Sequence, residues 1–288
     1  MNRFVIKFIE TIFIWHFCFP CLAQQNNSFK EQLKLIDSLK SFIQHKTDLK
    51  VWNGFYTKWA NPNDSMYIFV YASKNDKVQS VIDSGKSAWK YFDKEDSATV
   101  FIKKLKLQGY HTLLYRTAGA SSAFLNKELL SYPNEAVAFI LFHEATHQQI
   151  RSSNKAIPYA YEEATCDAVA NKFCKLFAQQ TGLVSISKVH LQERIFERCY
   201  KFLNREKAIL DSTHSDPNHI FRFSENRIKS LIKHGNQFHK DRMLYEINNA
   251  YILRISYYSS HYFEVKKYLQ ETNDISKVVN RILSVTKN

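Results

Sequence analysis

Residues 136–147 read AVAFILFHEATH, and this stretch decides the expected fold and site. Seven apolar residues lead into two histidines and a glutamate, a composition typical of a buried helix. Turn-forming residues on both sides predict one helix over about residues 134–151. Side chains four residues apart share a face of a helix. His143 and His147 are therefore expected to point at one place, with Glu144 at its edge.

Two histidines at this spacing form a zinc-binding pattern, because the neutral imidazole is a good zinc ligand. A catalytic zinc takes three protein ligands and keeps one position for water. Glu144 is then placed as the catalytic general base that takes a proton from that water. The alternative is a structural, hydrogen-bonded polar pair, but burying these groups in an apolar helix without a function would be costly. The sequence therefore predicts a Zn2+ centre that supports hydrolysis.

A third metal ligand is expected from a second helix that begins near Tyr159. Glu163 is the predicted ligand, and Asp167 lies four residues later on the same face. This spacing lets Glu163 bind the metal while Asp167 holds the free nitrogen of one histidine. Glu162 is the rival ligand. The alternative interpretation is that neither Glu162 nor Glu163 binds metal and that both lie in a solvated first helical turn, where acidic residues interact favourably with the helix dipole.

The rest of the chain predicts an α+β fold that is mainly helical. Residues 66–71 and 110–116 are rich in β-branched and aromatic residues, which favours two strands. A helix is expected to start after Asp93, as its N-cap, and to stop at Gly109. Beyond residue 185 the apolar spacing is almost entirely helical. We expect a small sheet beside the histidine-bearing helix.

Composition limits the class of protein. The 288 residues include only 6 Gly and 5 Pro, which argues against a turn-rich all-β sandwich. Apolar residues make up 45% of the chain, as in globular proteins. The net charge of +13 is spread along the chain without a dense basic block, so a nucleic-acid partner is not expected.

The first residues are typical of a signal peptide. A basic start, an apolar run over residues 8–19 and the small-residue end Cys21-Leu22-Ala23 follow one another. We predict a signal peptide over residues 1–23 and a single catalytic domain over residues 24–288, with a helical C-terminal half. The protein is expected to be exported, periplasmic or secreted, without a membrane span after cleavage. Anchoring through a retained N-terminus is the alternative.

Three cysteines remain after such a cleavage: Cys166, Cys174 and Cys199. An odd number without a CxxC pattern predicts neither a disulfide framework nor a cysteine zinc site. Cys166 and Cys174 are expected to pack as small apolar side chains.

Several segments resemble those of one family. They are Lys90-Tyr91-Phe92-Asp93, Leu105-Lys106-Leu107-Gln108-Gly109-Tyr110, Phe142-His143-Glu144-Ala145-Thr146-His147-Gln148, Tyr161-Glu162-Glu163-Ala164-Thr165 and Asn248-Asn249-Ala250 with Tyr257-Tyr258. From about residue 65 to the end, the chain resembles the bacterial predicted-aminopeptidase family of gluzincin-type zinc peptidases. The resemblance implies a zincin-like metallopeptidase fold, zinc bound through Glu163, and aminopeptidase action on peptide substrates. The chain departs from the family at Glu162, where the family has asparagine.

The remaining candidates are less firmly fixed by the sequence. Hydrolysis of a peptide bond needs an oxyanion donor, and Tyr258 is the first catalytic candidate, followed by Tyr257. Asn248 and Asn249 are expected to cap or cross-link helices. An aminopeptidase also needs a carboxylate for the substrate ammonium, and the sequence does not identify it. A zinc endopeptidase and a non-catalytic, zinc-stabilised binding protein therefore remain as alternatives.

Overall fold

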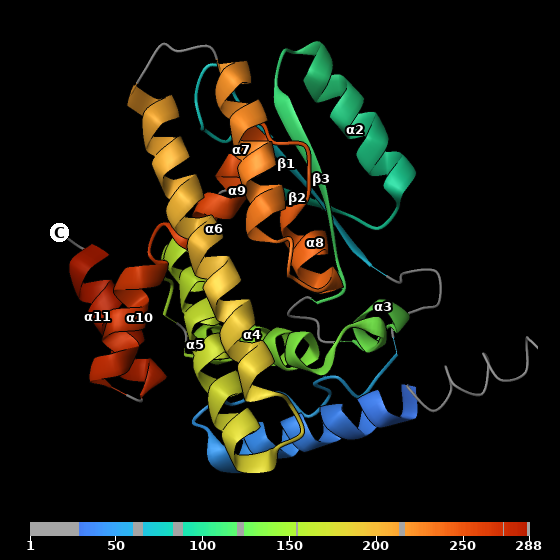
Figure 1. The fold of residues 1–288 in the computed structure, drawn as a ribbon, viewed down its shortest axis with the longest axis vertical. Coiled ribbons are helices and arrows are strands. Elements are labelled where there is room, and N and C mark those ends of the chain that lie inside the picture. Colours follow the sequence, from blue (N-terminus) through green and yellow to red (C-terminus); the bar gives the residue numbers. More distant parts are fainter. Residues whose placement is uncertain are drawn as a thin grey trace, which may run out of the picture.

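The computed structural model describes residues 29–59, 66–82, 89–119, 124–153, 155–212, 217–272 and 274–286. The predicted signal peptide over residues 1–23 lies outside these residues. The described chain is mainly helical and has one small antiparallel sheet (Figure 1), which confirms the α+β class.

In the described part of the chain, two helices accompany the three strands up to Thr117, and the elements after it are all helices. The strands are β1 (Tyr67–Ser73), β2 (Trp89–Phe92) and β3 (His111–Thr117). The helices are one over residues 29–46, α2 (Glu95–Leu107), α3 (Lys127–Ser131), α4 (Asn134–Ser152), α5 (Tyr159–Thr181), α6 (Ile186–Ser212), α7 (Pro217–Leu231), α8 (Gln237–Met243), α9 (Asn249–Ser259), α10 (Tyr262–Glu271) and α11 (Ile275–Thr286).

The sheet has the strand order β2-β1-β3, with both pairs antiparallel. Successive side chains of a strand point to opposite faces. Ile68, Val70 and Ala72 of β1 accordingly pack with α2, whereas Phe69 and Tyr71 face the main core. The two strands expected from the sequence are present. β2 was not predicted, because four residues are too short for a recognisable period.

Helix α4 is the centre of the fold. Every residue from Glu135 to His147 is buried, so the helix has no solvated face over this length. Helix α5 is its main neighbour, and the helix over residues 29–46 covers another side (Figure 1), with the Phe42 and Phe142 ring centroids 6.0 Å apart. The predicted helix over 134–151 is therefore confirmed to within one residue.

The sheet and α4 meet at a cavity. Helix α2 packs on one side of the sheet and α9 contacts β1 and β3, whereas residues of all three strands and of α4 line a common cavity. The site region thus lies between the sheet and the helical part of the molecule.

Local signals at the helix ends were partly misread. The N-cap of α2 is Lys94 and not Asp93, and its side chain makes no cap hydrogen bond; Glu95 and Asp96 occupy the first turn instead, where they favour the helix dipole. Gly109 follows the end of α2 with φ of +79°, a conformation that glycine adopts at little cost. Asn248 caps α9 as expected, accepting from two backbone amides.

Within the described residues, none of the helices is both long and apolar enough to cross a membrane. Cys166, Cys174 and Cys199 are free and buried, which for Cys166 and Cys174 is in accord with the expected packing role.

Candidate metal centre and active site

His143 and His147 converge at the cavity. Both come from α4 and both are buried. Their Nε2 atoms lie 3.2 Å apart, and the two rings meet edge to face with centroids 4.9 Å apart. The helical spacing of four residues is the local cause of this convergence.

Glu163 of α5 completes this group. One carboxylate oxygen lies 3.4 Å from Nε2 of His143, and the other lies 3.5 Å from Nε2 of His147. The side chain is buried, and its Oε2 has no hydrogen-bond partner among the described residues. Burial alone would raise the pKa of Glu163, but the two histidines outweigh it and hold the pKa well below its ordinary value. Glu163 is thus an anion in contact with both rings.

A second carboxylate stands behind each ring. Asp167 Oδ1 lies 2.9 Å from Nδ1 of His143, and Glu162 Oε1 lies 2.7 Å from Nδ1 of His147. The Glu162 contact is a hydrogen bond, which places a proton on Nδ1 of His147 and leaves Nε2 as the donor atom for a metal. Asp167 lies at ion-pair distance from His143, whose Nδ1 makes no hydrogen bond with a described residue. Glu162, considered from the sequence as a rival ligand, therefore lies on the opposite side of His147 from His143.

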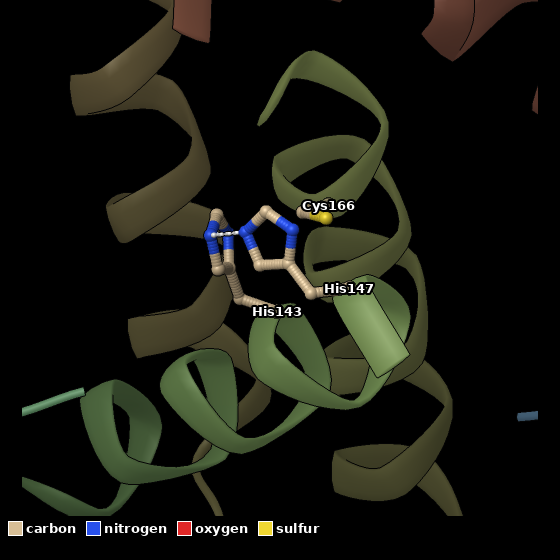
Figure 2. A group of neighbouring side chains, drawn as sticks. All are labelled: His143, His147 and Cys166. Atoms are coloured by element: carbon tan, nitrogen blue, oxygen red, sulfur yellow. Dashed lines mark hydrogen bonds between the residues drawn. The ribbon is translucent and has the colours of Figure 1, made fainter. Parts of the chain in front are cut away.

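Cys166 belongs to the same neighbourhood. His143, His147 and Cys166 form a buried group that could hold a metal ion, since each offers one ligand atom and these atoms lie within 4.8 Å of one another. Figure 2 shows the Cys166 sulfur beyond the His147 ring as seen from His143, near the ring nitrogen that does not contact His143. Burial raises the pKa of the Cys166 thiol to about 12, so it is neutral at neutral pH without a metal.

Glu144 borders the histidines from within the cavity lining. Burial raises its pKa, against the opposing effect of His143 and His147. Gly119, at the end of the sheet, approaches it closely: a Cβ at this glycine would lie 3.4 Å from Glu144 Oε1 and 2.6 Å from Cγ2 of Ile140. A side chain at position 119 would therefore clash with Ile140, in the turn of α4 that precedes Glu144.

Tyr258 also reaches the site. Its side chain lines the cavity, and its ring centroid lies 6.3 Å from that of His143. The hydroxyl makes no hydrogen bond to a residue that the structure describes. Tyr257 does not line the cavity and instead packs against Tyr159, with ring centroids 5.0 Å apart. Of the two tyrosines proposed from the sequence, Tyr258 is the one positioned at the candidate centre.

The cavity itself measures about 170 Å³ and has mostly aromatic walls. The sheet contributes Phe69, Tyr71, Trp89, Tyr115 and Thr117, and the helices contribute Phe139, Ile140, Tyr159, Phe238 and Tyr258 together with the ionisable residues His143, Glu144, His147, Arg151, Glu163 and Arg242. An apolar cavity with a few converging polar groups is the usual form of a small-molecule or substrate site.

A buried network behind His143 escaped the sequence reasoning. Arg242 of α8 donates through Nη2 to both oxygens of Asp167, at 2.8 and 2.6 Å, and the Tyr200 hydroxyl of α6 donates to Oδ2. Burial alone would raise the pKa of Asp167, but Arg242 and His143 outweigh it and keep the pKa below its ordinary value. Nothing in the local sequence around Tyr200 or Arg242 signals this role, because both contacts are long-range.

Comparisons of the chain with protein-family models, with curated proteins and with solved structures find no match. The resemblance to the predicted-aminopeptidase family therefore remains a prediction.

Proposed function

We propose that the protein is a zinc-dependent peptidase with a zincin-like fold, in which His143, His147 and Glu163 bind the metal. The observation that carries this proposal is the close approach of three side chains: the two Nε2 atoms lie 3.2 Å apart, and Glu163 places one carboxylate oxygen 3.4 Å from His143 and the other 3.5 Å from His147.

The spacing of these donors fits zinc. Ligand atoms at about 2.0–2.1 Å from a tetrahedral zinc lie about 3.3 Å from one another. The buried Glu163 Oε2, which lacks a hydrogen-bond partner among the described residues, would gain one interaction from the metal. Asp167 and Glu162 support the proposal further, because carboxylates at the far nitrogens of ligand histidines raise their basicity and fix their orientation.

Cys166 offers a different donor set and with it a second candidate function. A site closed by four protein ligands, often including cysteine, is typical of structural zinc. If Cys166 joined the metal, the protein would be a zinc-stabilised binding module. We favour the open site with Glu163, because Cys166 and Glu162 both face the side of His147 that is turned away from His143.

In this proposal each chain residue has a distinct task. Bound zinc would supply Lewis-acid activation of water and of the scissile carbonyl. Glu144 accepts the proton of the attacking water and passes it to the leaving amine. Tyr258 donates a hydrogen bond to the oxygen on which negative charge develops.

Metal analysis of the purified protein tests the ligand set. We expect close to one zinc per chain, loss of zinc in His147→Ala and Glu163→Gln, and retained zinc without turnover in Glu144→Gln. Cys166→Ala is the matched control, because it removes the rival donor from the same turn of α5 as Glu163. Loss of zinc and of thermal stability in Cys166→Ala, with zinc retained in Glu163→Gln, would establish the structural site instead.

Which end of a peptide is recognised is a separate matter. Aminopeptidase action rests on the resemblance, and an endopeptidase is the alternative. Among the described residues that line the cavity, the carboxylates are Glu144 and Glu163, and this proposal assigns both of them to other tasks. No described lining residue is therefore available to bind a substrate ammonium by ion pairing.

A further inference from the structure

Two buried arginines lie beside the cavity. Arg242 lines it directly. Arg254 of α9 is completely buried, and its guanidinium carbon lies 3.6 Å from the ring centroid of Tyr115, a residue of the cavity wall. The two are joined, because Arg254 Nη1 donates to the backbone carbonyl of Arg242 at 3.0 Å. We call Arg242 and Arg254 the arginine pair.

The charges of the arginine pair are not balanced within the described chain. Asp167 pairs with Arg242, but Arg254 forms no salt bridge with a described carboxylate. Its Nε and Nη2 are buried without a hydrogen-bond partner among those residues, and the neighbouring rings of Tyr115 and Tyr258 offset the charge only in part. A guanidinium stays protonated in proteins, and a buried charge without a counter-ion is costly. Arg254 therefore places a positive charge without a salt-bridge partner among the described residues next to a cavity whose lining also holds the carboxylates of Glu144 and Glu163.

Arg242 has one free donor nitrogen for a ligand. All its side-chain hydrogen bonds within the described chain run through Nη2, to Asp167 and Tyr200. Nη1, the other end of the same planar fork, makes none of them. Nη2 is held by Asp167 and Tyr200 and Nε is buried, so Nη1 is the nitrogen that can donate a charge-assisted hydrogen bond to one carboxylate oxygen.

We propose that the cavity recognises a substrate carboxylate, bound by Arg242 and favoured by the unbalanced charge of Arg254. The inference rests on the proposed peptidase function and specifies its substrate class: peptides whose C-terminal carboxylate or acidic side chain enters the cavity beside the scissile bond. The aromatic walls accommodate the apolar part of the same residue.

A binding experiment on metal-free protein tests the carboxylate site without catalysis. Zinc itself binds carboxylates, so it is removed, and the Arg254 variants separate the effect of the arginine pair from that of His143 and His147 in the same lining. The probes are 3-phenylpropionate, its uncharged amide and 3-phenylpropylamine, titrated by calorimetry or by tryptophan fluorescence, to which Trp89 of the cavity wall contributes. We expect the carboxylate to bind at least tenfold more tightly than the amide, and the amine to bind more weakly than both. Equal affinity for acid and amide, or a preference for the amine, would overturn the proposal.

Variants measure the contribution of the Arg254 charge. Arg254→Met keeps the length and removes the charge, so the preference for acid over amide should fall at least fivefold. Arg254→Lys should retain most of it, and Arg281→Met, on the exposed face of α11, is the matched control. Circular dichroism and thermal melting report whether each variant folds. If Arg254→Met does not fold, the selectivity of the wild-type protein among the three probes still decides the question.

Cleavage of matched peptides by the zinc-loaded protein separates the two sources of carboxylate. The set combines free or acetylated N-termini, free or amidated C-termini, and Glu or Gln beside the cleavage position. Loss of cleavage on amidation identifies the C-terminal carboxylate, and loss on changing Glu to Gln identifies the side chain. Cleavage that requires only a free N-terminus would overturn the carboxylate site while the zinc peptidase stands. Selective carboxylate binding without any cleavage would instead support this site and reject the proposed peptidase.

Discussion

Asp167 is the residue whose replacement should have the widest effect. The side chain of Asp167 is buried, with 1% of its surface exposed. Its carboxylate contacts His143, accepts a hydrogen bond from Tyr200 and forms an ion pair with Arg242. Asp167→Asn preserves the shape of the side chain and removes its charge. The substitution therefore tests the support of the candidate metal centre and the stability of the buried network together.

Two magnitudes follow from the structure. Removing one partner of a buried ion pair leaves the other uncompensated and costs about 3–5 kcal/mol. This cost is a large fraction of the free energy of unfolding of an ordinary protein, which is about 5–15 kcal/mol. Loss of a carboxylate that supports a ligand histidine lowers metal affinity by about 10- to 100-fold. We expect both effects in Asp167→Asn, with the first also present in metal-free protein.

Urea unfolding of the metal-free protein and competitive zinc titration measure the two effects separately. Asp211→Asn is the control, because it makes the same chemical change at an exposed pair with Lys207, where about 0–1 kcal/mol is expected. Tyr200→Phe removes one hydrogen bond to the same carboxylate and should cost only about 1 kcal/mol, so it remains informative if Asp167→Asn does not fold. An Asp167→Asn protein with unchanged unfolding midpoint and zinc affinity within twofold of the wild type would refute this reasoning.

Three further predictions concern other parts of the chain. Burial lowers the pKa of His239 to about 4, so on acidification the unfolded chain binds a proton before the folded chain does, and the free energy of unfolding should fall by about 2 kcal/mol between pH 6.5 and 5. The pH dependence of urea unfolding should be weaker in His239→Gln, and an unchanged pH dependence would contradict this prediction. Gly119→Ala should reduce turnover with zinc retained, because the new Cβ lies 2.6 Å from Ile140 Cγ2 and displaces the region around Glu144. The double variant Gly119→Ala with Ile140→Ala should regain activity, and full activity in the single variant would count against the steric argument. Mass spectrometry of the native protein should find a start near Gln24, whereas an intact Met1 in a cytosolic fraction would speak against export.

Local sequence was enough to bring several residues of the site together. The period of the α-helix puts His143 and His147 on one face of α4, and the same period relates Glu163 to Asp167 on α5. The apolar residues before the motif also predicted that α4 would be buried. Such features depend on residues close in the sequence, where geometry is fixed by the backbone hydrogen bonds of a single helix.

Long-range packing decided the rest. The rotation of α5 against α4 determined that Glu163 meets the Nε2 atoms while its neighbour Glu162 takes the far side of His147. Arg242 lies 75 residues after Asp167 in the sequence, and Arg254 follows on a later helix; no local pattern marks either arginine. Helical and strand periods tell which side chains share a face, but only the packing of distant faces decides which charges meet. The network behind His143 and the unbalanced arginine pair could therefore be recognised only in the tertiary structure.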